Sequence, residues 1–410
     1  MKRDIVLLRY PSIRALWMVR LIKVFGSGLP LLAFQWVATD LPHPALALAM
    51  QKVAISVGEL AIMLYGGWLA DYKSTRSMVV VGDIGAGIAL VGAGALAMLH
   101  MHYAVYALFV TLAVVYVMAG SVSRAPGRTL IPRVVDRQDL PKVNAWFGSL
   151  RWWRGILGSL AAGYLIALVG PVGPLFLAAA FIVASGLVAM KTLGTSPAEQ
   201  SRPRPPIRPT IHSVLDSRVL SRVLIFAFAM QFASGMAMVE LTVYARFDLG
   251  FSALKLGIAL AVGSLGSVLG LVMSPRLLPN RLRAAVLLPP IALATTLGLW
   301  LVTPTPVGFV AGLVTLMLST TMLNAATGYL RQTHSPITRT GSIAGTLGTV
   351  HQLGNLAGVL VGGALDTILA LTTSMRVALV VLVPVVALAW WLWRSTNGGG
   401  PISRHVVGEV

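Results

Sequence analysis

The sequence predicts an all-α membrane protein whose chain crosses the bilayer twelve times, in two bundles of six helices. Its 410 residues have a mean hydropathy of +0.81 and only 11% charged side chains, against about 25% in soluble domains. Twelve apolar runs follow one another with short polar breaks, and a membrane helix needs about 20 such residues. The composition therefore excludes a water-soluble globular enzyme and an intrinsically disordered chain.

The order of the apolar runs gives the domain organisation. One long polar segment, residues 194–222, is rich in proline and arginine and is typical of a cytoplasmic linker. It separates a first bundle over residues 1–193 from a second over residues 223–393, and residues 394–410 form a cytoplasmic tail. The ninth run includes a Pro-Pro pair, which membrane helices tolerate where neighbouring groups satisfy the backbone. We expect the twelve spans at residues 15–39, 46–70, 77–99, 104–123, 144–168, 174–193, 223–246, 254–278, 285–302, 307–330, 341–371 and 375–393.

Membrane topology explains the formal net charge of +19. Most of the 32 lysines and arginines lie at the two termini and in alternate loops, whereas the other loops carry almost none. Such an excess of basic residues marks the cytoplasmic loops of membrane proteins. Both termini are therefore expected in the cytoplasm, and we expect no nucleic-acid partner. The chain has no cysteine, which excludes disulfides and thiolate metal sites, and we expect neither a metal nor a cofactor.

The two halves of the chain resemble one another weakly. Gly158 and Gly163 of the fifth span are matched by Gly358 and Gly363 of the eleventh. Small residues let membrane helices approach closely, so the shared spacing predicts equivalent tight contacts in the two bundles. A repeat of this kind, with six spans on each side of a linker, is typical of transporters.

The segment GGWLADYKSTR lies between the second and third spans and contains a glycine, an acid and two bases in a tight cytoplasmic turn. In this position it resembles the signature loop of the major facilitator superfamily, although that family usually has glycine where Ser74 stands. The resemblance implies a cytoplasmic gate that ties the two halves together in the outward-open state. The gate residues are Gly67, Asp71, Lys73, Arg76 and, at the cytoplasmic end of the fourth span, Arg124.

Longer stretches extend the resemblance over most of the chain. Three stretches resemble the branch of the superfamily that holds the enterobactin exporter and the macrolide-efflux proteins. They are LLRYPSIRALWMVRLIKVFGSGLP, LIPRVVDRQDLPKVNAWF and YLRQTHSPITRTGSIAGTLGTVHQLGNLAGVLVGGALD. The resemblance implies a multi-pass protein of the bacterial cytoplasmic (inner) membrane that exports a drug, siderophore or secondary metabolite. We expect the protein to be a monomer. The chain contains no GxxxxGK[ST] motif, so we expect transport to use the proton gradient instead of bound ATP.

Acidic groups inside spans are costly in lipid and are therefore candidates for proton binding. Glu59 lies near the middle of the second span and shares a helix face with Lys52 and Ser56. It is either a proton-binding carboxylate or one partner of a structural ion pair. The reserve candidates are Glu240 in the seventh span and His351 in the eleventh.

Four basic residues lie inside the first and fifth spans, towards the cytoplasmic side. They either extend to the cytoplasmic surface and pair with acids such as Asp83, or they line a substrate cavity. Guanidinium groups in a cavity suit carboxylate and catecholate oxygens, so the second alternative predicts an anionic or oxygen-rich substrate. With polar residues of other spans, the cavity candidates are Arg20, Lys23, Gln35, Arg151, Arg154, Asn324 and Asn355.

The sequence thus predicts a secondary transporter, not an enzyme, with a small-molecule substrate and the lipid bilayer as its partners. The favoured function is proton-coupled export of a small amphipathic molecule by alternating access. An importer of an organic anion with the same fold is the first alternative, and a polytopic membrane enzyme or a sensor is the second. A sensor is expected to carry a larger soluble domain than this chain provides.

Overall fold

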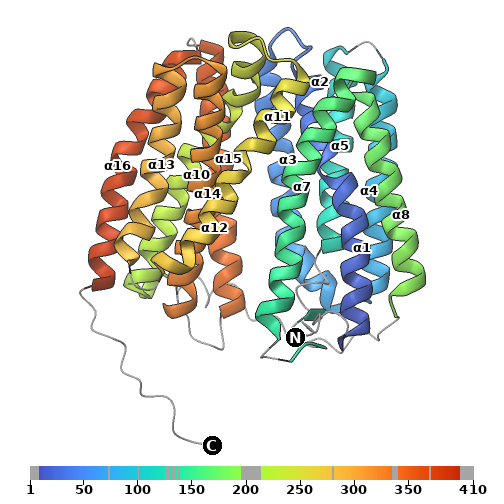
Figure 1. Ribbon diagram of the computed structural model, residues 1–410, viewed down its shortest axis with the longest axis horizontal. Helices are drawn as coiled ribbons and strands as arrows, with labels where there is room; N and C mark the ends of the chain where they lie inside the picture. Colours follow the sequence, from blue (N-terminus) through green and yellow to red (C-terminus); the bar gives the residue numbers. More distant parts are fainter. Residues whose placement is uncertain are drawn as a thin grey trace, which may run out of the picture.

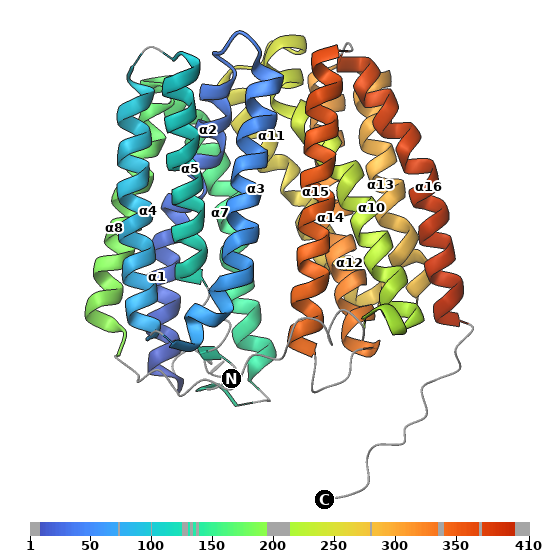
Figure 2. The same ribbon diagram turned by 180° about the vertical axis from the view of Figure 1, so that it is seen from behind.

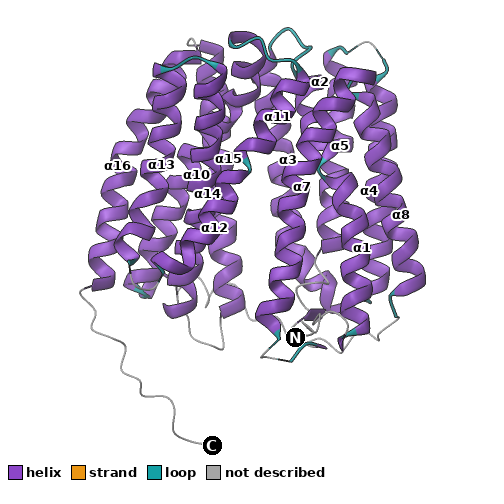
Figure 3. Cartoon of the chain, viewed as in Figure 1, coloured by secondary structure: helices purple, strands orange, loops and turns teal. Residues whose placement is uncertain are grey.

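The computed structural model shows two bundles of helices standing side by side (Figure 1). Figure 3 shows these helices joined by short loops, and the residues that the structure describes contain no strand. The described residues are 9–72, 74–99, 101–124, 130–131, 134–136, 139–194, 214–278, 281–334, 340–368 and 371–397.

The first bundle holds the six expected spans, the first of which is broken into two helices at Gly28. Prolines occupy the first turns of α1, α2 and α7. The N–H groups of a first turn have no acceptor within the helix, so proline, which lacks this group, costs no hydrogen bond there. The helices are α1 (Pro11–Ser27), α2 (Leu29–Ala38), α3 (Pro44–Tyr72), α4 (Thr75–Ala97), α5 (Tyr103–Arg124), α7 (Leu140–Val169) and α8 (Val172–Thr192).

The second bundle holds the other six spans, and here the eighth is broken, at Ser264. The twelve predicted spans are thus confirmed, with their ends shifted by a few residues. The helices are α10 (Arg218–Val243), η2 (Tyr244–Asp248), α11 (Ala253–Gly263), α12 (Leu265–Leu277), α13 (Leu282–Val302), α14 (Pro306–His334), α15 (Thr340–Ile368) and α16 (Leu371–Asn397).

The span α15 carries several polar side chains, among them His351, Gln352 and Asn355. Ten described helical segments are long and apolar enough to cross a membrane, and Trp153–Val169 of α7 is a further apolar stretch. Both helices pack against the opposite bundle, α7 on α11 and α15 on α3. Part of their surface is therefore covered by protein instead of lipid, which lets them carry polar groups.

The charge distribution identifies the two ends of the molecule. α1 begins and α16 ends at the same end, which is the end of the basic loops and therefore the cytoplasmic one (Figure 1). The ribbons of the two bundles lie together at the external end and apart at the cytoplasmic end in both views (Figures 1 and 2). The structure thus has a cytoplasm-facing arrangement of its halves.

The repeated glycines make the equivalent contacts that their spacing predicts. Gly158 of α7 lies against the backbone of Gly28, at the break between α1 and α2. In the second bundle Gly358 of α15 lies against the backbone of Phe232 on α10. A Cβ at either position would overlap the facing backbone, so each bundle requires glycine where its fifth span meets its first.

The other repeated pair joins the two bundles to each other. A Cβ built on Gly163 of α7 would lie 2.6 Å from the carbonyl oxygen of Ala253 and 2.9 Å from Cα of Gly257, both on α11. Gly363 of α15 lies against Ala49 of α3 in the corresponding way. The fifth span therefore meets the eighth, and the eleventh meets the second, in a symmetrical interface.

Arg246 on η2 connects the bundles at the external end. Its guanidinium pairs with Asp40 at 2.8 Å and donates to the hydroxyl of Thr39. It also stacks on Trp36, with its central carbon 4.5 Å from the ring centroid. All three partners belong to the first bundle, so this cation fixes the external ends in the closed arrangement.

The first prediction concerns the contact between α10 and α15. Gly358→Ala places a methyl group on the carbonyl of Phe232, and the helices must separate. We expect a loss of about 1–3 kcal/mol in the free energy of unfolding, as for other overpacked sites. Gly328→Ala is the matched control, because nothing lies within 4 Å of a Cβ at that glycine. Thermal unfolding in one detergent compares the variants, and equal midpoints would contradict the close contact.

The second prediction concerns the external ion pair. Asp40→Asn removes one charge of a partly exposed pair, which contributes up to about 1 kcal/mol, and so raises the externally open fraction several-fold. The chain has no cysteine, so spin labels on introduced His43→Cys and Thr303→Cys report the external distance between bundles. We expect more long distances in the variant. Asp136→Asn, which changes an exposed cytoplasmic acid, is the control. Unchanged distances in Asp40→Asn would show that the ion pair of Arg246 does not hold the external ends of the bundles together.

Candidate functional site

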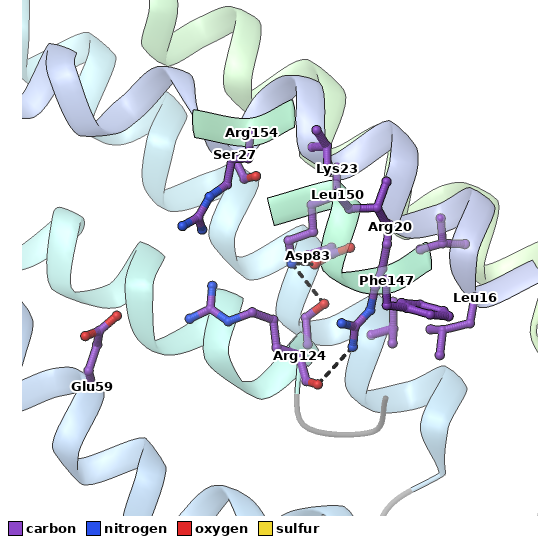
Figure 4. Close-up of a pocket in the computed structure, with 14 residues that line it drawn as sticks. Leu16, Arg20, Lys23, Ser27, Glu59, Asp83, Arg124, Phe147, Leu150 and Arg154 are labelled. Carbon is purple, nitrogen blue, oxygen red and sulfur yellow. Dashed lines mark hydrogen bonds and ion pairs between the residues drawn. The ribbon is translucent and has the colours of Figure 1, made fainter. Parts of the chain in front are cut away.

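A cavity lies among the cytoplasmic halves of α1, α3, α4, α5 and α7 (Figure 4). It encloses about 430 Å³. Four basic and two acidic side chains line it, so its formal charge has a surplus of two positives: Arg20, Lys23, Arg124 and Arg154 against Glu59 and Asp83. The rest of the wall combines apolar side chains with two hydroxyl groups: Leu16, Val19, Val24, Val79, Phe147, Leu150, Ser27 and Ser123.

Lys23 and Asp83 form a buried ion pair in the cavity wall. The Asp83 side chain is 0% exposed and that of Lys23 is 12% exposed. The Lys23 ammonium also donates to the hydroxyl of Ser123 at 2.9 Å, and the hydroxyl of Ser185 donates to Asp83. The pair thus joins α1 to α4, α5 and α8. Lys23 is one of the residues that line the cavity, but its charge is already compensated by Asp83.

Two of the arginines are held by neighbouring groups. Arg20 donates to the backbone carbonyl of Arg124 at 2.9 Å and stacks on Phe147, 5.5 Å from the ring centroid. Arg124 donates to the hydroxyl of Ser121 at 2.6 Å. These contacts fix both guanidinium groups in the cavity wall.

Arg154 is an accessible cation of the cavity. Its residue is exposed, and within the described residues its guanidinium forms neither a hydrogen bond nor an ion pair. Its backbone is fixed, because its carbonyl oxygen lies 2.5 Å from the position of a Cβ on Gly28. The break between α1 and α2 therefore lets α7 approach and holds Arg154 in place. Figure 4 shows the guanidinium groups of Arg154 and Arg124 extending to the side on which Glu59 lies.

Glu59 connects the cavity to the second bundle. It is half-buried on α3 and lines the same cavity as Arg154. The side-chain amide of Gln352, on α15, donates to Glu59 Oε2 at 3.4 Å. Lys52, on the same helix, is directed elsewhere, since its ammonium bonds to the carbonyl of Met238. Glu59 is therefore an acid that faces both the cationic cavity and the interface between bundles.

Other predicted cavity residues lie elsewhere. Gln35 accepts a hydrogen bond from the hydroxyl of Thr242 at 2.9 Å, a contact between the bundles on the external side. Asn324 is exposed on α14, and His351 and Asn355 are half-buried on α15. Neither these three cavity candidates nor His351, a candidate for proton binding, lines the cavity that contains Arg154.

Several predicted residues lie partly or wholly outside the described part of the chain. Only the helical backbone is described for Arg151, Glu240, Gly67 and Asp71, and Lys73 lies outside the described residues. The following helix is well defined: the Ser74 hydroxyl accepts from the backbone N–H of Ser77 at 3.2 Å and caps α4. A serine in the place of the family's glycine thus has a capping role. Arg76 is half-buried in the first turn of the same helix.

Similarity to known proteins identifies the family of this chain. The chain matches the family model of the Major Facilitator Superfamily over residues 16–359. A search of curated protein sequences gives no match.

Solved transporters share the fold. A bacterial homologue of the iron transporter ferroportin, in an inward-facing state, has a TM-score of 0.71 and 16% identity, covering 95% of this chain and 99% of its own. A bacterial homologue of the human lysosomal transporter Spinster, inward-facing and unoccupied, has a TM-score of 0.70 and 13% identity, covering 97% and 99%. The nucleoside transporter NupG has a TM-score of 0.69 and 13% identity, covering 94% and 99%.

The family match spans most of the chain, and the helix order, the paired bundles and the symmetrical interface are those of a two-half transporter. This protein is therefore a multi-pass membrane transporter, not an enzyme, and belongs to the major facilitator superfamily.

Proposed function

We propose that this transporter exports a small amphipathic molecule with negative charge or dense oxygen acceptors, such as a siderophore or another secondary metabolite, in exchange for protons. The observation that carries the proposal is Arg154, an accessible guanidinium in a cavity with a surplus of two positive charges. The resemblance to the enterobactin-exporter and macrolide-efflux branch adds the direction of transport and the bacterial inner membrane.

The chemistry of the wall selects the substrate class. A guanidinium forks onto two oxygens at once, which suits a carboxylate or a catecholate. Leu16, Phe147 and Leu150 supply apolar surface in the same cavity, whose volume of about 430 Å³ suits a small organic molecule. A free metal cation is disfavoured because basic groups outnumber acids in the cavity, and the described residues contain no group of three metal-binding side chains.

Energetics support export of an anion. An interior-negative membrane potential favours the exit of negative charge by about 2.3 kcal/mol per charge per 100 mV. The structure has its cytoplasmic ends apart, which is the arrangement in which an exporter takes up its load. Glu59 supplies a group that can exchange a proton when the cavity changes sides.

A second candidate is an importer that carries the same anion together with a proton. One observation favours it: Glu59 shares the cavity with Arg154, so protonation of Glu59 removes a negative charge that repels the substrate. Proton and anion then bind together, as in cotransport. In an exchanger the two must instead exclude one another through the conformational change.

The third prediction tests the anion site. Arg154→Gln removes charge-assisted hydrogen bonds to the substrate, and about 10- to 100-fold weaker transport of an anionic compound follows. Transport of a cationic compound should be unchanged or improved. Arg154→Lys keeps the charge without the fork and should recover part of the activity. Flux into everted vesicles measures each variant, with Arg276→Gln, an exposed arginine outside the cavity, as the control. Loss for the cation alone would overturn the proposal.

The fourth prediction separates the two candidates. Glu59→Gln imitates the protonated acid and should abolish accumulation driven by a pH gradient in proteoliposomes. In an exporter that exchanges protons the variant binds the anion more weakly than the parent protein, and in a cotransporting importer it binds the anion more tightly. Equilibrium binding to the purified variant gives the sign. Accumulation of substrate against a pH gradient by the variant would show that another group carries the proton.

A further inference from the structure

A cluster of arginines and tryptophans covers the cytoplasmic ends of α10, α13 and α16, away from the cavity. These helices pack together in the second bundle, and Figures 1 and 2 show α16 at its outer side. We call this the Arg–Trp cluster, and it consists of Arg222, Arg283, Arg394, Trp390, Trp391 and Trp393.

Each arginine of the cluster stacks on an indole ring. The central carbon of Arg222 lies 4.0 Å from the ring centroid of Trp391. That of Arg283 lies 4.7 Å from Trp390 and 4.9 Å from Trp393. Arg394 approaches Trp390 at 5.4 Å. Because stacking uses the flat face of a guanidinium, the N–H groups at its edge stay available for hydrogen bonds.

All three charged groups of the cluster are positive. Within the described residues none of its three guanidinium groups pairs with a carboxylate, and Arg222 makes one hydrogen bond, to the carbonyl of Trp391 at 3.2 Å. Arg283 and Arg394 lie over the same Trp390 ring, so their like charges lie close to each other and repel. An anion bound between them would relieve this repulsion.

The position of the cluster matches the headgroups of the cytoplasmic leaflet. On α16 the residues Val380 and Val383 are 68% and 69% exposed, and Trp391, two turns further on, is 40% exposed. Exposed valines on a membrane helix face acyl chains, and tryptophan and arginine at its end lie at headgroup depth. The negatively charged lipids of the cytoplasmic leaflet attract basic groups at this depth.

We propose that the Arg–Trp cluster binds the phosphate of an anionic phospholipid of the cytoplasmic leaflet, whose acyl chains lie along the apolar face of α16. The guanidinium edges donate to the phosphate oxygens, and the indole rings hold the guanidinium planes in position. The bound lipid bridges α10, α13 and α16 at their cytoplasmic ends.

The arginines that merely mark topology provide the control. Arg276 lies in the last turn of α12, on the same side of the membrane, and is also exposed. Within the described residues it stacks on no aromatic ring. If the basic charge of the cytoplasmic face alone held the lipid, Arg276 and the arginines of the cluster would contribute equally.

The test is native mass spectrometry of the full chain, purified from mixed vesicles of phosphatidylcholine and phosphatidylglycerol. We expect the parent protein to retain phosphatidylglycerol preferentially, and Arg283→Gln with Arg394→Gln to lower its retention about ten-fold. Arg276→Gln should retain as much as the parent. Arg283→Lys with Arg394→Lys keeps the charge, and partial recovery in that pair shows that the loss in the glutamine pair is not a failure to fold.

Two further measurements test the role of the indole rings and whether the site prefers a lipid to a free anion. Trp390→Leu with Trp393→Leu keeps the apolar surface and the charges, and an intermediate loss is expected because the guanidinium planes lose their support. Inorganic phosphate at 10 mM, roughly the concentration at which weak anion sites fill, should leave the lipid bound. Displacement by phosphate would make the cluster a general anion site. Equal retention of the two lipids, or equal loss in Arg276→Gln, would overturn the proposal.

Discussion

The buried ion pair between Lys23 and Asp83 is the interaction on which the first bundle depends. Charges inside a membrane protein are tolerated only when they are compensated or face water. This pair achieves compensation and, with the hydroxyls of Ser123 and Ser185, fixes four helices around one point. Removal of either partner would leave an isolated buried charge, at a cost of about 3–5 kcal/mol. Because Lys23 and Asp83 compensate each other, the surplus of positive charge in the cavity comes from the arginines that line it.

Close backbone contact supplies the second constraint, and it allows motion as well as packing. The bundles touch through glycine, where Gly163 of α7 lies against α11 and Gly363 of α15 lies against α3. Interfaces without large side chains have few interlocking groups, so helices can rock against one another at these points. Directional bonds are concentrated at the external end, where Arg246 pairs with Asp40. The closed external end therefore depends on a few breakable interactions, as a transporter that must open there requires.

The fold could be predicted from sequence much further than the site. Hydropathy and basic loops determine the spans and their orientation, because the bilayer imposes one length and one charge rule on every helix. The breaks at Gly28 and Ser264 were not predicted, since glycine and serine are common inside membrane helices. The depth of Arg154 was evident from its distance to the end of its span. The partner of Lys23 was not, because Asp83 lies two spans further along the chain and only packing brings the two together.

The cavity and the external closure are linked by electrostatics. Without substrate, the basic side chains that line the cavity outnumber the acidic ones by two, and the space between them must shrink when the cytoplasmic ends approach. Shrinking the space expels water and strengthens the repulsion. A bound anion converts this repulsion into attraction, so loading favours the approach of the cytoplasmic ends and competes with the ion pair of Arg246 that holds the external ends together. A cation gives no such gain. The surplus of charge can thus select the substrate twice, once in binding and again in the step that carries it across the membrane.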